Sequence, residues 1–218
     1  MTKISPAGFS LLAELAKNNT RDWYAEHKDD FKAKIIQPFG AMLEVMSERL
    51  MAYNVDFRGG PKTVFRMNRD VRFSKDKSPY KTNVSGMLTP SGAKSERNGF
   101  VYMQMDAEGG FAAFGRYNLR PAALGPIRDR ILGESKTFGK ILAALRDHDL
   151  DLDRDSTLKS MPRGYSEHDK HEFSDELKLK NMMVRIDLPK AAFTSGEAVN
   201  IVSDTALKCQ SFIRFVSV

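Results

Sequence analysis

The chain has 218 residues, of which 41% are hydrophobic and 10% aromatic, so it can bury a core and has the length of one large domain. No apolar run is long enough to cross a bilayer, and the first residues lack the apolar core of a signal peptide, so we expect a cytoplasmic protein with no membrane partner. The single cysteine, Cys209, excludes an intramolecular disulfide and cannot form a zinc cluster by itself. We expect it to be a buried thiol.

The formal net charge is +6, and most of it lies in one short stretch. Residues 66–81 hold six cations and two carboxylates, a net charge of +4 that leaves only +2 for the rest of the chain. Charge concentrated in this way favours a site for an anionic partner over a generally basic surface. The alternative is a solvated loop that acidic residues elsewhere in the fold neutralise.

Two helices are expected in the N-terminal quarter. Ser5 before a proline is a typical start for the first, and its apolar pattern ends at Asn18. Thr20 can cap the second, whose apolar residues recur every three or four positions as far as Leu50. Pro38 lies inside this second helix and should kink or split it.

A breaker cluster at residues 59–61 ends the helical pattern, and short strand-like segments follow it. These segments are residues 63–67, 83–90, 99–106 and 109–117, with turn-like residues at 91–99 and 107–110. Within 99–106 the more apolar side chains alternate with the more polar ones, and this period of two residues is typical of a strand. Consecutive strands joined by short turns predict an antiparallel meander.

Helical spacing returns in residues 121–132 and 136–148, although Gly125-Pro126 is awkward inside a helix and makes Pro126 an alternative start for the first of them. Three segments complete the chain: a polar, irregular stretch at 149–180, a strand at 181–188 and a packing helix at 202–216. Helices, then strands, then helices indicate an α+β fold. We expect a single domain over residues 1–218, in which an antiparallel β-sheet, with central strands at roughly 63–118, packs against N- and C-terminal α-helices.

The basic stretch interleaves its cations with apolar residues, which suggests a loop anchored to the core. If 63–68 is a strand, Phe65 and Met67 face one way, and Val71 and Phe73 pin the loop that follows, so that the cations form the presented face. Arginine forks suit phosphate or carboxylate groups. The candidate ligand-binding residues are Arg66, Arg69, Asp70, Arg72, Lys77, Tyr80 and Lys81, with Arg21, Trp23, Tyr102 and Arg116 as possible periphery.

An anionic small molecule or a nucleotide is the first partner that this chemistry suggests, and a nucleic acid is the second. No cofactor is expected, and no catalytic residue can be named. In one alternative, the arginines and aspartates form an internal scaffold. In another, the chain is a metal-dependent phosphoester hydrolase that uses Asp70, Asp76, Asp106 or Glu108, although the last two are typical of a turn.

Three further residues leave alternatives open. Trp23, the only tryptophan, is a stacking platform or a core anchor, and Arg21 either reaches the basic stretch or pairs with a nearby acid. His168 and His171 have the spacing of two metal ligands on a helix, but their charged surroundings are typical of an exposed surface.

The basic stretch closely resembles the signature of a domain-of-unknown-function family, number 2461. The matching positions are Arg66, Arg69, Asp70, Arg72, Phe73, Asp76, Lys77, Pro79, Tyr80 and Lys81. Further resemblance lies at Asn19, Arg21 and Trp23, at residues 99–106, and at Pro121, Leu124, Ile127, Arg128 and Ile131. Arg116 departs from the aromatic-Gly-aromatic pattern expected there. The resemblance implies a single-domain cytoplasmic bacterial protein with no assigned activity.

Overall fold

The computed structural model describes residues 2–96 and 99–218 and contains one four-stranded antiparallel sheet in the order β1-β2-β3-β4. The strands are β1 (Val84–Leu88), β2 (Phe100–Met105), β3 (Gly109–Arg116) and β4 (Met182–Pro189). Strands β1 and β2 pair from Val84 opposite Met105 to Leu88 opposite Val101. The predicted α+β class and the last three predicted strands of the meander are confirmed, and the predicted turn at 91–99 includes residues outside the described ranges.

The described residues group into two compact units. Unit 1 comprises residues 2–96, 101–112 and 186–207, and unit 2 comprises 99–100, 113–185 and 208–218. The single domain expected from the sequence stays a prediction.

In unit 1, the first predicted helix is confirmed as α1 (Pro6–Lys17), and Ser5 caps it by accepting a hydrogen bond from the Gly8 N–H at 3.3 Å. The second predicted helix is split into α2 (Arg21–Glu26), α3 (Lys28–Phe31), a π-helical segment (Lys32–Ile36) and α4 (Gln37–Ala52). Pro38, in the first turn of α4, has no N–H for the regular helical ladder, so the ladder widens just before it. The predicted break near Pro38 is therefore confirmed.

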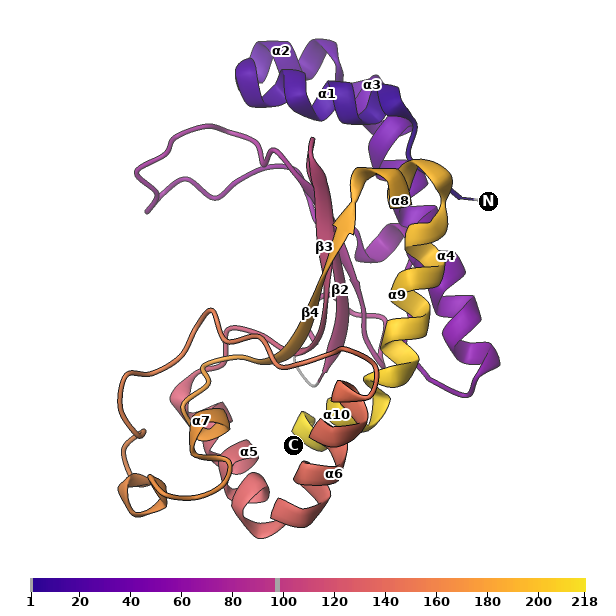
Figure 1. Cartoon of the computed structure of the whole chain (residues 1–218). Coiled ribbons are helices and arrows are strands. Elements are labelled where there is room, and N and C mark those ends of the chain that lie inside the picture. The colour runs from indigo at the N-terminus through magenta and orange to yellow at the C-terminus, as the bar shows by residue number, and fades with distance from the viewer. Residues whose placement is uncertain (1, 97–98) are drawn as a thin grey trace. The chain divides into compact units, whose positions relative to one another are not determined.

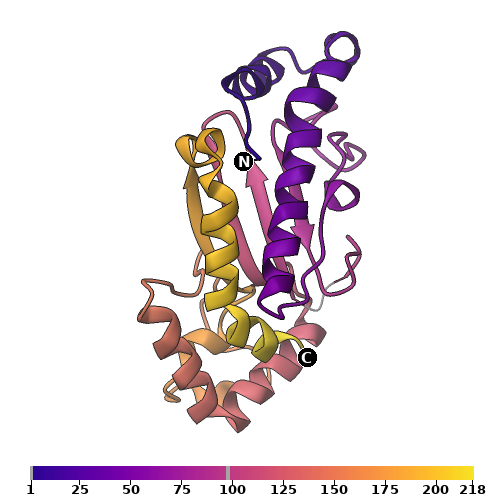
Figure 2. The same cartoon turned by 90° about the vertical axis from the view of Figure 1, so that its right-hand side faces the viewer.

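Helices α4, α8 (Lys190–Ser195) and α9 (Glu197–Lys208) belong to unit 1, and α4 and α9 run side by side along the sheet (Figures 1 and 2). Arg49 of α4 joins them through a 2.7 Å ion pair with Asp204 of α9. Leu43 of α4 packs against β1 at Gly86, where a Cβ atom would collide with it. The absence of a side chain at Gly86 thus lets the helix approach the strand closely.

Unit 2 contains α5 (Pro121–Gly133), α6 (Ser135–Arg146), α7 (Ser174–Leu177) and α10 (Gln210–Val216). Helix α5 begins at Pro121 and runs through Pro126, so the alternative start at Pro126 is wrong. Gly125 explains this, because it has no Cβ to clash with the ring of the proline that follows it. The predicted C-terminal helix is divided between α9 and α10, with buried Cys209 between them.

No helix in the described part of the chain is long and apolar enough to cross a membrane.

Candidate functional site

The basic stretch forms a long excursion from unit 1, and residues 65–81 are called the signature loop below (Figure 1). Its base is tied to β1 by a hydrogen bond from the Phe65 N–H to the Ser85 carbonyl at 2.8 Å. Its two arms are joined by the Lys81 N–H, which donates to the Met67 carbonyl at 2.8 Å, and by the Arg69 N–H, which donates to the Pro79 carbonyl at 2.9 Å. Residues 70–78 form the tip.

The strand predicted at 63–67 is wrong. The chain forms a 3₁₀ turn at Pro61–Thr63 and then only isolated bridges, Val64 with Gly86 and Asn68 with Tyr80. The Thr63 hydroxyl closes the turn by accepting from the Gly60 N–H at 2.9 Å and donating to the Gly60 carbonyl at 3.0 Å. Because Thr63 is used to close this turn, it does not begin a ladder of strand hydrogen bonds, and the expected strand does not form.

The predicted apolar anchors of the loop are only partly correct. Met67 is buried and Phe65 is half-buried, as an anchoring role requires. Val71 is only half-buried, and Phe73 is 95% exposed, so the prediction that Phe73 pins the loop is wrong. Phe73 lies in the tip, where the guanidinium of Arg72 is 5.8 Å from its ring centroid.

Arg69 holds the tip of the signature loop together. Its guanidinium donates to the Asp76 carboxylate and to the Ser78 hydroxyl, and it reaches the Ser74 hydroxyl at 3.4 Å. Asp76 also accepts from the Ser78 N–H at 2.9 Å. The hydrogen bond from Arg69, followed by those from Ser78, lowers the pKa of Asp76. This arrangement is what the scaffold hypothesis expects of Arg69.

A second ion pair joins Arg72 to Asp70. Two nitrogens of Arg72 donate to the two carboxylate oxygens of Asp70, at 3.0 and 2.7 Å, and this contact lowers the pKa of Asp70. Lys77 donates to the Val71 carbonyl at 3.0 Å. Both carboxylates of the loop are therefore already paired with arginines.

Two cations near the base of the loop lack such a partner, and Arg66 and Lys81 are called the cation pair below. Neither makes an ion pair within the described ranges. Lys81 is half-buried, with its ammonium 5.7 Å from the centroid of the Phe65 ring. Burial lowers the pKa of Lys81, and the charge of Arg66 lowers it further. Two like charges thus influence each other here, and neither is held in an ion pair, although the charge of Arg66 also contributes to the lowered pKa of Asp70.

Tyr80 is clamped to the N-terminal helices of unit 1. The Asn19 side chain donates to the Tyr80 carbonyl at 2.9 Å and accepts from the Tyr80 N–H at 3.1 Å. The Tyr24 ring stacks on the Tyr80 ring at 3.9 Å, and burial, with a further effect of Tyr80, raises the pKa of Tyr24. One face of Tyr80 is therefore covered. Asn19 was not a predicted site residue, and its only signal was its place in the N-terminal motif.

The predicted periphery is divided between the units. Tyr102 lies beside the base of the loop, with its ring 6.4 Å from that of Phe65. Trp23 is half-buried, stacks on His27 at 4.0 Å and meets the buried Phe31 ring edge-on at 6.2 Å, so the core-anchor interpretation is partly correct and the stacking platform stays a prediction. Arg21 is exposed. Arg116 belongs to unit 2, where it is buried and donates to the carbonyls of Val216 and Val218 at 3.1 and 3.0 Å.

The other candidate ligands make local contacts. Asp106 accepts from the N–H groups of Glu108 and Gly109 at 2.9 and 3.2 Å, which confirms the turn interpretation. His171 contacts the Ser135 hydroxyl at 3.3 Å, and His168 lies 3.4 Å from the carboxylate of its neighbour Glu167. Across residues 2–96 and 99–218, no three histidine, cysteine, aspartate or glutamate side chains gather as a metal site would need.

Cys209 is buried, and burial raises the pKa of its thiol to about 12. The prediction of a buried thiol is confirmed.

Comparison with protein families identifies the chain. The model of DUF2461, described as a conserved hypothetical protein, matches residues 7–215. The chain belongs to this family. The match spans both units, so the family suggested by the sequence is confirmed, while DUF2461 carries no assigned activity. Searches of curated proteins and of solved structures found no match.

Proposed function

We propose that this DUF2461 protein binds an anionic ligand, one that bears a phosphate or carboxylate group, at the cation pair Arg66 and Lys81. One observation carries the proposal: neither cation makes an ion pair with a described residue, although Lys81 is half-buried beside the Phe65 ring and the charge of Arg66 adds to the lowering of its pKa. An anion bound beside both would offset the repulsion and raise the pKa of Lys81 again. The arginine fork and the lysine point charge would both contribute hydrogen bonds.

The other residues of the loop support the pair in different ways. Arg69 joins the two arms of the loop on the tip side of the cation pair, since its contacts with Asp76 and Ser78 close the tip. Asn19 fixes the backbone of Tyr80, the residue next to Lys81. The pair therefore stands on a held backbone, which lowers the entropy lost when a ligand binds.

The aromatic surroundings of the pair favour a compact ligand with a planar ring, such as a nucleotide. Phe65 lies under Lys81, and Tyr102 lies beside Phe65. Aromatic faces beside cations stack on bases and hold the attached phosphate at the same time. A small molecule or nucleotide is the first partner in this proposal, and a nucleic acid is the second.

The proposal is tested by calorimetric titration with ATP, inorganic pyrophosphate and a single-stranded oligonucleotide. We expect Arg66→Ala and Lys81→Met each to weaken binding by about tenfold, the loss of one charge-assisted hydrogen bond. Lys75→Ala is the matched control, because it removes an exposed cation of the tip and leaves the pair intact. Equal losses in all three variants would mean that only the net charge of the loop matters.

Salt separates the two partner classes. A nucleic acid bound through several phosphates gives an affinity that falls steeply with salt, with a log–log slope of about −0.7 for each contact on a single strand. A compact anion at the pair gives a slope of about −1 to −2, because only two cations are involved. Absence of binding to any of the three ligands would refute the proposal.

A further inference from the structure

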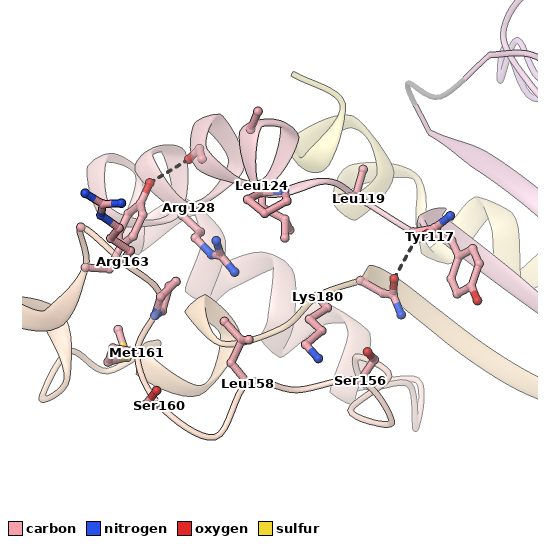
Figure 3. A pocket seen from close by; sticks show the side chains of 18 residues that line it. Tyr117, Leu119, Leu124, Arg128, Ser156, Leu158, Ser160, Met161, Arg163 and Lys180 are labelled. Carbon is pink, nitrogen blue, oxygen red and sulfur yellow. Dashed lines mark hydrogen bonds between the residues drawn. The ribbon is translucent and has the colours of Figure 1, made fainter.

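A second feature of the molecule lies in unit 2, where a pocket of about 1020 Å³ opens beside the start of α5 (Figure 3). Three segments form it: residues 117–128, residues 156–165 of the irregular stretch, and residues 180–181 just before β4. Its volume is that of a site for a small molecule. None of the residues predicted from the sequence to bind ligand lines it.

The pocket has one sign of charge. Arg128, Arg163 and Lys180 line it, and its lining contains no aspartate or glutamate. Neither Arg163 nor Lys180 makes an ion pair or a side-chain hydrogen bond with any described residue. In Figure 3, the side chains of Arg128 and Lys180 lie in the middle of the pocket, while Arg163 is at the end opposite Tyr117. An anion entering the pocket would meet these donors and no lining carboxylate, and the nearby Asp129 carboxylate accepts from the Tyr165 hydroxyl at 2.6 Å.

Arg128 is the fixed donor of the pocket. It is only 4% exposed, and its Nε and Nη2 atoms donate to the carbonyls of Leu177 and Leu179 at 2.7 and 3.2 Å. These two bonds hold the plane of the guanidinium, while the Nη1 atom has no partner among the described residues. The ring of Tyr165 lies 5.7 Å from the guanidinium carbon and covers it. A donor held in this way loses little freedom when it binds a ligand.

Much of the remaining wall is apolar. Leu119, Leu124, Leu158, Met161 and Pro162 line the pocket together with Pro121 and Ala122 of the first turn of α5. The positive end of the α5 dipole adds to the field of the cations. Apolar walls suit a hydrocarbon or ring, while the cations suit a charged head.

We propose that this pocket binds a small amphiphilic anion, a carboxylate or phosphate monoester with an apolar body. The head would contact the Nη1 atom of Arg128 and the ammonium of Lys180, and the body would lie against Leu124, Leu158 and Met161. The inference rests on unit 2 alone and does not depend on the function proposed for the cation pair.

The test is a calorimetric titration with four eight-carbon probes: octyl phosphate, octanoate, octanol and octylammonium. We expect one or both anions to bind at least tenfold more tightly than octanol, and octylammonium not to bind. The anion that binds more tightly identifies the head group. Lys180→Met should weaken that anion at least fivefold, whereas Lys159→Met, which removes an exposed lysine outside the lining, should leave it unchanged.

Two variants fill the pocket. Ala122→Phe places a ring in the pocket from the exposed side of α5, and Ser160→Trp places one there from the irregular stretch. If one of these variants does not fold, the other still tests whether filling the pocket blocks binding. We expect either to abolish anion binding, and Ala144→Phe, on the exposed face of α6, to retain it. Lys81→Met should also retain it, which separates this site from the signature loop. Equal affinity for octyl phosphate and octanol, unchanged binding in a folded pocket-filling variant, or no binding of either anion would overturn the proposal.

Discussion

Replacing Arg128 by methionine tests whether a buried cation holds unit 2 together. The new side chain has a similar length and keeps the apolar contacts of the stem, so the main loss is that of two hydrogen bonds. These run from the guanidinium to the carbonyls of Leu177 and Leu179, at the end of α7 and just beyond it. Both carbonyls would be left without that donor in a region where Arg128 itself is buried.

The expected loss follows from these two contacts. A hydrogen bond that involves a charged group contributes about 1.5–3 kcal/mol, so the two together contribute about 3–6 kcal/mol. Burial of the guanidinium opposes this, as its lowered pKa indicates, and methionine removes that cost. We therefore expect a net destabilisation of about 2–4 kcal/mol. For a chain of this size, that corresponds to a fall in Tm of about 4–16 °C.

Thermal and urea unfolding followed by circular dichroism measure the effect. Lys140→Met is the matched control, because it places the same side chain at an exposed position of α6 whose lysine makes no side-chain hydrogen bond to a described residue. An unchanged or raised Tm in Arg128→Met, relative to that control, would refute the reasoning. It would mean that the burial of the guanidinium costs as much as its two hydrogen bonds contribute.

Four further outcomes follow from the structure. Arg69→Ala should speed cleavage of the signature loop by a protease specific for aromatic residues while Tm changes little, because its contacts close only an exposed tip; an unchanged cleavage rate contradicts this. Anion affinity at the cation pair should fall as pH rises toward 10.5, because the lowered pKa of Lys81 means that it loses its charge at a lower pH than a free lysine. A titration midpoint of Lys81 above 10.5 in the unliganded protein would contradict this. In an ultraviolet titration, Tyr24 should ionise above pH 10 and Tyr165 near pH 12. The free energy of unfolding should fall as pH rises through this range, since a raised tyrosine pKa means that the folded state favours the neutral form. A single titration of all six tyrosines near pH 10 would contradict this. Cys209 should react with a thiol reagent only after unfolding, and rapid reaction of the native protein would show that the helix junction opens.

Periodic segments of the chain could be predicted because their burial pattern is local. The apolar positions around Phe39 and Leu50 repeat every three or four residues and are buried in α4, and the alternation in 99–106 forms β2. The family-matched residues Leu124 and Ile127 are buried in α5 for the same reason. In each case, neighbours along the chain decide which face meets the core.

The features that sequence reasoning missed depend on residues far apart. Phe73 has the composition of an anchor, but whether an apolar residue reaches the core depends on where the loop goes, and this one extends away from it. The contact of Asn19 with Tyr80 joins residues 61 positions apart. The pocket of unit 2 is bounded by α5 and by the irregular stretch, and no pattern in either segment indicates that the two lie against each other.

The sequence located the signature loop but could not assign roles within it. Arg66, Arg69 and Arg72 look alike in the sequence, yet two of them are paired with carboxylates of the loop and one is not. Pairing depends on how the tip folds back on itself, and the distance between the ion-pair partners along the chain, two residues for Arg72 and seven for Arg69, has no fixed period. The geometry therefore divides a motif that composition treats as uniform.

The stacked pair of Tyr24 and Tyr80 gives the protein an internal optical reporter. The only tryptophan, Trp23, precedes Tyr24 in α2 and lies 6.2 Å from Phe31, against which Tyr24 also packs at 4.9 Å. Energy absorbed by the tyrosines would pass to one acceptor, Trp23, which lies next to the contacts that hold Tyr80 of the signature loop. Any ligand or substitution that releases Tyr80 changes the surroundings of that acceptor. The emission of the unlabelled protein can therefore follow the loop in real time.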